Sequence, residues 1–284
     1  MKIRYQAGWA MLVLVGPIGA QRLPPPLMLN HFYAVLDSVT YTEILESPYL
    51  QTQFAGFKSR SPATWFGRHT YLEFFDPHGY DGARPGDVGI ALGIEEAGGI
   101  ALTARRYVAL GAPFDTVTER RGTPQQSEPY FHRFRPAGVD ATSPRTAFWV
   151  MEYTLEASRA LAARDSLPLR DLGRDRFLAD RFDPTRLLGD ITGATVAIPV
   201  EDIAALTRAM QRLGAEVITE GEGAIVRISS FTLRLLPAWE RPGLRRLEFV
   251  LMHDAIANPS FRFGPRSRLR FGPGRIAVWD FALP

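Results

Sequence analysis

The chain has 284 residues, of which 46% are hydrophobic, and its formal net charge is only +3. A chain of this length and composition can bury a sizeable core without a metal ion or a disulfide. The absence of cysteine excludes thiol nucleophiles, thiolate metal sites and disulfides. The arginines are scattered and carry no aromatic-interleaved motif, so we expect no nucleic-acid partner.

The first twenty residues have the pattern of a secretory signal peptide. A basic start at 1–4 precedes a short apolar run at 10–15, and small residues follow at 16–20. We therefore predict cleavage before Gln21, a leader over residues 21–29, and a periplasmic or secreted mature protein. The apolar run is too short to span a bilayer without its flanks, so we expect no stable membrane insertion after cleavage. An uncleaved membrane tether is the alternative.

Residues 30–48 predict a strand followed by a helix. Side chains at 30–36 alternate across a strand, which puts His31 and Tyr33 on one face and Phe32 on the other. The helix then carries an apolar stripe, and Thr40 and Glu43 have the spacing of a capping box. This helix is expected to cover the face that carries Phe32.

Three short strands are predicted next, at 54–57, 65–67 and 70–75. In the last of them, Tyr71, Glu73 and Phe75 share one face. Residues 30–77 thus have the order β-α-β-β-β, with His31 on the first strand and Glu73 on the last.

This order of elements resembles the half-module of the glyoxalase-like, or vicinal oxygen chelate, superfamily. The segments 31–33 and 71–75 are most similar to an exported branch of it. The resemblance implies that two modules pair to form a cupped sheet, which holds a divalent metal or a small ligand against its concave face. It also implies that His31 and Glu73 stand where this family has metal ligands.

The middle of the chain is less regular. Residues 86–94 predict a strand beside the first module, and residues 98–110 favour a helix, so we assign 30–110 to that module. Gly, Pro, Ser and Thr are dense over 111–145, which predicts an excursion over the surface, and we read 111–190 as a connector.

Within this connector, residues 147–153 predict a strand that carries Trp149 and Glu152. A carboxylate among large apolar side chains is costly unless it is paired, hydrated or metal-bound. Glu152 therefore either faces solvent or an arginine, or lies in the cup.

A second β-α-β-β-β pattern occupies 192–237, and further strands at 246–281 complete residues 191–284. Matching the two copies by pattern puts Ala194 opposite His31 and Arg234 opposite Glu73, so the second copy lacks both ligand-type residues. We predict an α+β protein in which the two copies share one cupped mixed sheet, with extra C-terminal strands.

Two functions follow from these residues. In the first, a divalent metal (Zn, Fe, Mn or Ni) binds His31, Glu73 and a completing ligand such as Glu152 or Glu248, because imidazole and carboxylate suit these ions. The protein would then be a lyase, isomerase or oxygenase acting on a small oxygenated substrate. Its catalytic proton carriers are Glu73, Tyr33, Tyr71 and Glu152.

In the second, the protein binds or sequesters a small molecule without metal. The ligand-lining residues would be Tyr33, Tyr71, Phe75, Trp149 and Arg234, which give an aromatic and cationic surface for a small ligand, either neutral or anionic. No nucleophile elbow, His-Glu-x-x-His motif or phosphate-binding glycine loop occurs in the sequence.

Overall fold

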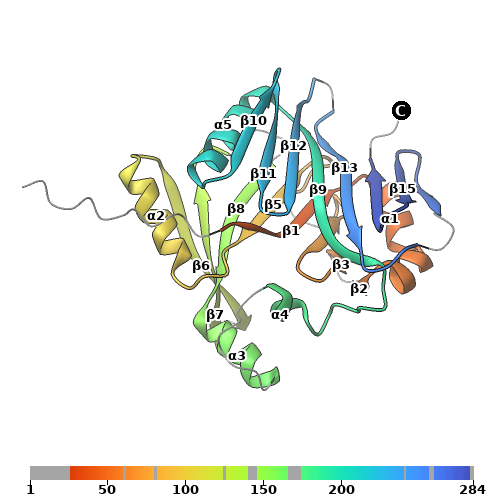
Figure 1. The fold of residues 1–284 in the computed structure, drawn as a ribbon, viewed down its shortest axis with the longest axis horizontal. Helices are drawn as coiled ribbons and strands as arrows, with labels where there is room; N and C mark the ends of the chain where they lie inside the picture. The colour runs from red at the N-terminus through yellow and green to blue at the C-terminus, as the bar shows by residue number, and fades with distance from the viewer. Residues whose placement is uncertain are drawn as a thin grey trace, which may run out of the picture.

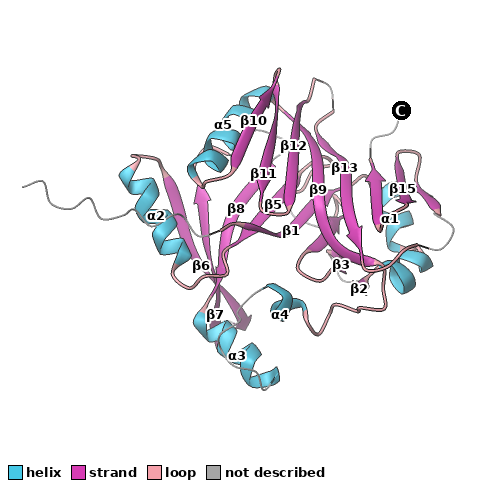
Figure 2. Cartoon of the chain, viewed as in Figure 1, coloured by secondary structure: helices cyan, strands magenta, loops and turns pink. Residues whose placement is uncertain are grey.

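The computed structural model describes residues 26–59, 62–79, 82–123, 126–139, 146–165, 174–239, 241–255 and 259–281. These residues form two mixed sheets of eight strands each, with the helices packed against them (Figures 1 and 2). The predicted signal peptide lies outside the described residues. No described helix is long and apolar enough to cross a membrane.

The first sheet contains two β-α-β-β-β modules side by side. The first module has β1, α1, the π-helix η1 and three more strands: β1 (Met28–Val35), α1 (Ser38–Leu45), η1 (Leu50–Phe54), β2 (Gly56–Lys58), β3 (Ala63–Phe66) and β4 (Tyr71–Phe75). The second module follows directly: β5 (Val88–Gly93), α2 (Gly99–Ala109), β6 (Phe114–Thr123), β7 (Gln126–Pro136) and β8 (Thr146–Tyr153). Their order in the sheet is β2-β3-β4-β1-β5-β8-β7-β6, with β1 and β5 antiparallel at the centre.

This arrangement confirms the predicted α+β class with paired modules, but it changes the partner. We expected residues 30–77 to share a sheet with residues 192–237, and those two copies lie in different sheets. The true partner is residues 88–153, much of which we had read as a surface connector. In each module the helix crossover makes the first and last strands parallel, β1 with β4 and β5 with β8.

The second sheet repeats the plan with one helix missing. Its first half is β9 (Leu188–Ile198), α5 (Val200–Arg212), β10 (Glu216–Glu220), β11 (Gly223–Ile228) and β12 (Phe231–Pro237). Its second half is β13 (Gly243–Leu251), β14 (Ser260–Phe263), β15 (Ser267–Gly272) and β16 (Ile276–Asp280), with no helix among the described residues between β13 and β14. Without the crossover, β13 and β16 run antiparallel instead of parallel.

The helix of the first module takes the place of the missing one. Tyr49, just after α1, stacks on Phe261 of β14 at 4.0 Å between ring centroids, and Phe54 contacts Trp279 of β16 at 6.2 Å. Elsewhere the hydroxyl of Tyr107 on α2 donates to the carbonyl of Ala209 on α5. One continuous core therefore joins the two sheets.

The start of α1 differs from the predicted capping box. Asp37 is the N-cap, and its carboxylate accepts from the backbone N–H and the hydroxyl of Thr40. Glu43 instead accepts from the backbone N–H of Gly264, in the turn between β14 and β15. The carboxylate thus stabilises the contact with the second sheet.

The two sheets are joined through α3 (Leu155–Asp165) and α4 (Arg174–Leu178). We call residues 174–187 the strap, because they run past one end of the first sheet on the face away from α1 and α2. Phe177 of the strap stacks on Tyr153 at 4.5 Å and packs in a cluster with Phe66 and Leu178. The strap closes one end of that face.

Candidate functional site

The face of the first sheet that carries His31 is its candidate functional surface, which we call the cup face. The register pairs His31 with Tyr71 and Tyr33 with Glu73, so all four side chains project from this face. Trp149 joins them, because it pairs with Ala91, which in turn pairs with His31. The strand alternation in the sequence therefore placed His31 and Glu73 correctly on one face.

A cavity of about 410 Å³ opens on the cup face. We call it the cup pocket. Its lining comes from both modules: His31, Tyr33, Val35, Tyr71, Asp87, Phe131, Arg133, Arg135, Ala147, Phe148 and Trp149. Glu73 and Phe75, which we also expected in the site, lie on the same face but do not line this pocket.

The wall of the cup pocket is aromatic. The ring of His31 stacks on Tyr71 with 4.4 Å between centroids, and Trp149 meets His31 edge-on at 5.3 Å. Tyr33 lies 6.1 Å from Trp149. A Cβ at position 89 would lie 1.9 Å from Cε1 of Tyr33, so glycine there lets the tyrosine ring lie over β5. Such a surface suits a planar ligand.

His31 is buried and electrically neutral. Burial lowers the pKa of His31 to about 3, because the charged imidazolium would lose its hydration. Its Nδ1 is 2.8 Å from Oδ1 of Asn30, which is itself buried. Because that oxygen can only accept, the contact needs the proton on Nδ1 and leaves Nε2 unprotonated.

The tyrosine beside it is equally fixed in its protonated form. Burial, with the negative charge of Glu73 as a second cause, raises the pKa of Tyr71 well above its ordinary value. Tyr71 is therefore a hydrogen-bond donor and a stacking surface, not a base at neutral pH.

Two arginines that the sequence analysis did not select stand at the other side of the pocket. Arg135 forms an ion pair with Asp115, and Nη1 of Arg133 is 3.0 Å from Glu119. The Nε of Arg133 is buried and has no hydrogen-bond acceptor in the described parts of the chain. These arginines lie on β7, which we had predicted as part of a surface excursion; alternation of Phe131, Arg133 and Arg135 was the available signal.

Glu73 holds its proton more tightly than an ordinary glutamate. Burial raises the pKa of Glu73 to about 7, while Lys58 and a hydrogen bond from Thr64 act in the opposite direction. The neighbours that lower the pKa lie toward β2 and β3, away from the cup pocket. Glu73 can therefore exchange a proton near neutral pH at the edge of the cup face.

Glu152 lies on the opposite face of the sheet. We expected it either to face solvent or an arginine, or to lie in the cup, and both predictions were wrong. Its two carboxylate oxygens accept from the backbone N–H groups of Gly98 and Ile100, at 2.7 and 2.8 Å. It therefore binds the start of α2 and stabilises the core side of the sheet. Trp149 shares the face of His31, and residue 152 is an odd number of positions further along the same strand. Glu152 therefore points to the other face and cannot complete a site with His31.

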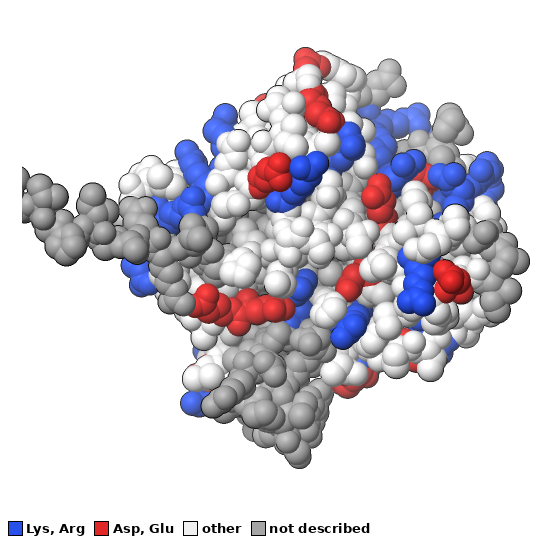
Figure 3. Space-filling model, viewed as in Figure 1, with Lys and Arg blue, Asp and Glu red and all other residues white. Residues whose placement is uncertain are grey.

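Arg234 belongs to the second sheet and does not reach the cup pocket. It forms an exposed ion pair with Glu220 at 2.8 Å, and Arg227 forms another with Glu216. Figure 3 shows acidic and basic side chains next to one another over these strands. The register pairs Arg234 with Thr195 and places Ala194 on the core side, so the residue that matches His31 is Gly193.

A model of a family of unknown function (DUF5829) matches residues 29–281. The chain belongs to this family. No curated protein matches the DUF5829 chain. Among solved structures, a hypothetical protein from Staphylococcus aureus aligns with a TM-score of 0.51 at 8% identity, over 83% of this chain and 95% of that one. This likeness supports the fold alone.

Two further solved structures are less similar. An extradiol ring-cleaving dioxygenase from B. fuscum aligns with a TM-score of 0.39 at 12% identity, and the DUF5829 chain covers 55% of its length. A xylose isomerase-like TIM barrel/4-hydroxyphenylpyruvate dioxygenase fusion protein aligns with a TM-score of 0.45 at 12% identity, with 38% of its length covered.

The residues on the cup face do not fit the metal site that we expected. A metal needs three or more protein donors in most sites of this type. The first module offers the unprotonated Nε2 of His31 and the carboxylate of Glu73, whereas the second presents Ala91, Trp149 and Met151 on this face. Within the described ranges no group of three His, Cys, Asp or Glu residues is placed to hold an ion. Glu248, the other candidate, is in the second sheet.

Proposed function

We propose that this DUF5829 protein binds a small planar organic anion in the cup pocket. The single observation that carries the proposal is Arg133, whose buried Nε lacks an acceptor beside an aromatic-walled cavity. A buried donor without a partner costs about 1–3 kcal/mol, and a carboxylate from a ligand would satisfy it.

The rest of the pocket supports the same ligand class. Its volume is within the range of small-molecule sites, and its lining combines aromatic rings with the charged residues Arg133, Arg135 and Asp87. A flat ring would stack on Trp149 and Tyr33, and its acidic group would point to Arg133. His31 and Tyr71 add hydrogen-bonding groups without adding charge. Arg133 and Arg135 outnumber Asp87, the one carboxylate of the lining, so the pocket favours a negative group.

One observation favours a second function, which is a proton-transfer enzyme acting on the same class of ligand. Glu73 has a pKa raised to about 7, and a general acid or base works best when its pKa is near the working pH. A substrate would have to extend from the cup pocket past Tyr33 to reach this carboxylate. Loss of turnover with unchanged binding in Glu73→Gln would support the enzyme over the binding protein.

The binding test uses a panel of aromatic carboxylates, each compared with its neutral amide, in isothermal titration calorimetry. We expect the acids to bind more tightly than the amides, and Arg133→Gln to weaken only the acids, by about tenfold or more. Trp149→Ala should weaken both members of each pair. Arg234→Gln removes an arginine from the second sheet and is the matched control. Equal affinities for acid and amide would contradict the proposal.

We also propose that the mature protein begins near Gln21 and acts outside the cytoplasm, on the pattern of its first twenty residues. N-terminal sequencing of the protein from its native host tests this. A soluble cytoplasmic product that keeps Met1 would contradict it.

A further inference from the structure

A second cavity, of about 340 Å³, lies where the two sheets meet. We call it the seam pocket. From the first sheet it takes the end of β1, the start of α1 and the turn at 85–86, and from the second it takes the start of β13, the β14–β15 turn and Phe281. It shares only Val35 with the lining of the cup pocket.

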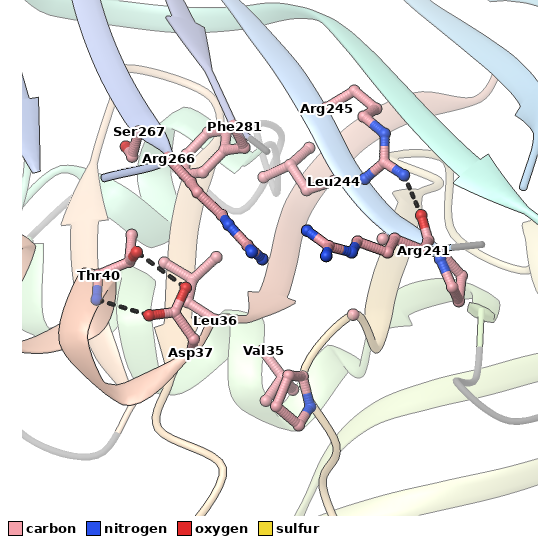
Figure 4. Close-up of a pocket in the computed structure, with 14 residues that line it drawn as sticks. Val35, Leu36, Asp37, Thr40, Arg241, Leu244, Arg245, Arg266, Ser267 and Phe281 are labelled. Carbon is pink, nitrogen blue, oxygen red and sulfur yellow. Dashed lines mark hydrogen bonds between the residues drawn. The ribbon is translucent and has the colours of Figure 1, made fainter. Parts of the chain in front are cut away.

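Three arginines line the seam pocket. Arg241 and Arg245 come from the start of β13 and the loop before it, and Arg266 comes from the turn between β14 and β15. Figure 4 shows the guanidinium groups of Arg241 and Arg266 pointing toward one another across the cavity. The guanidinium of Arg245 donates to the carbonyl of Arg241. Burial, and after it the charge of Arg241, lowers the pKa of Arg245, as expected where two cations lie close together.

No acidic side chain of the described residues forms an ion pair with any of the three. Asp37 is the one carboxylate of the lining, and both of its oxygens accept from Thr40 at the start of α1. Some other arginines of the second sheet do have an acidic partner: Arg246 and Arg270 both pair with Asp280. The seam pocket therefore has an excess of positive charge that no carboxylate of the described residues neutralises.

The floor of the seam pocket is closely packed and partly apolar. Gly243 has φ of 124°, and a Cβ there would lie 2.8 Å from the Cα of Gly86 in the first sheet, so the backbones are in close contact. Leu36, Leu244 and Phe281 supply apolar walls. An occupant would need an anionic group for the arginines and only a small apolar part.

We propose that the seam pocket is an oxyanion-binding site, which takes the phosphate or carboxylate group of a small organic acid between Arg241 and Arg266. The planar guanidinium presents paired N–H donors that match two oxygens of either group. The anion removes the repulsion between the arginines and cross-links the two sheets. This site is independent of the ligand in the cup pocket.

The test compares two double variants that each remove two positive charges. Arg241→Gln with Arg266→Gln changes the seam pocket, and Arg227→Gln with Arg234→Gln changes exposed ion pairs on the outer strands of the same sheet. Inorganic phosphate and malonate are the two probes, titrated calorimetrically at constant ionic strength into the full chain. Comparing the affinities for malonate and for phosphate shows whether the site prefers a carboxylate or a phosphate group.

We expect at least one probe to bind the wild type at a single site, with affinity reduced tenfold or more in the seam variant and unchanged in the control. Because a ligand that binds only the folded state stabilises it, the same probe should raise the unfolding temperature of the wild type and of the control alone. Arg241 and Arg266 are exposed, so the seam variant is expected to fold. Binding by neither probe, or equal binding to both double variants, overturns the proposal.

Discussion

The cup face of the first sheet and the corresponding outer face of the second sheet carry very different side chains. On the cup face His31 is buried, and aromatic rings surround it. On the outer face Arg234 and Glu220 form an ion pair in which both side chains are nearly half exposed, at 46% and 48%. Glu73 and Arg234 nevertheless occupy matching strands of the same β-α-β-β-β plan.

The difference lies in how far each face is covered rather than in the module itself. The strap packs Phe177 and Leu178 against Tyr153 and Phe66 at one end of the cup face. Elsewhere on that face burial shifts the pKa values of His31 and Glu73. Polar groups on the open face of the second sheet stay hydrated and pair as surface charges do. The same fold therefore gives one ligand-type surface and one solvated surface.

The largest expected effect concerns His31. Its pKa is about 3 in the folded protein, below the ordinary 6.5, so the unfolded chain binds the proton first as the pH falls. Folding stability from this group is present above pH 6.5 and is lost toward pH 3. Between pH 7 and pH 4 the wild type should lose about 3 kcal/mol more than His31→Phe.

Urea unfolding at a series of pH values measures this difference. His253→Gln changes an exposed histidine of the second sheet and should keep the wild-type dependence. Parallel curves for the wild type and His31→Phe would show that His31 is not buried in solution.

The next effect concerns Glu152, which holds the start of α2 from the core side of the first sheet. Glu152→Ala leaves the buried N–H of Ile100 and that of Gly98 without acceptors and should cost about 2 kcal/mol. Glu216→Ala removes an exposed partner of Arg227 on the second sheet and should cost no more than about 0.5 kcal/mol. Chemical denaturation gives both values; equal losses would mean that Glu152 has no special role.

The smallest effect concerns Glu73. Its folded pKa is raised from 4.5 to about 7, so its contribution to stability falls as the pH rises through that window. At pH 8 Glu73→Gln should be more stable than the wild type by about 1 kcal/mol, after allowance for partial exposure. Arg234→Gln on the matching strand should show no such pH-dependent gain. A Glu73→Gln variant that is less stable at pH 8 would contradict the assignment.

The sequence was informative where burial is one-sided. Alternation in β1 and β4 predicted both strands and their shared face, because a one-residue error would have turned Phe32 and Phe74 toward the cup. The same alternation in β8 puts Glu152 and Trp149 on opposite faces of the sheet. The sequence comparison matched His31 with Ala194, whereas the strand register matches it with Gly193. The error arose because β9 has small side chains on both faces, so hydrophobic alternation does not distinguish the two faces.

The second module was missed for a different reason. The β6–β7 hairpin carries charged residues such as Glu119 and Arg133, and its loops are rich in Gly and Pro, so its local pattern is that of a surface excursion. The hairpin joins the sheet because β7 pairs with β8. A local sequence pattern carries no information about this pairing. Alternation alone put Phe131, Arg133 and Arg135 on one face of a strand, but only that pairing brings the strand to the cup pocket.

The lack of a described helix between β13 and β14 has a consequence for how the chain can fold. Tyr49 and Phe54 follow α1, yet they pack on Phe261, Phe271 and Trp279 of the strands that come last in the second sheet. Contacts between residues so far apart in sequence close a long loop and slow the search for the native state. Until β14, β15 and β16 have formed, the aromatic surface beside α1 is uncovered, and exposed apolar surface of this kind favours aggregation.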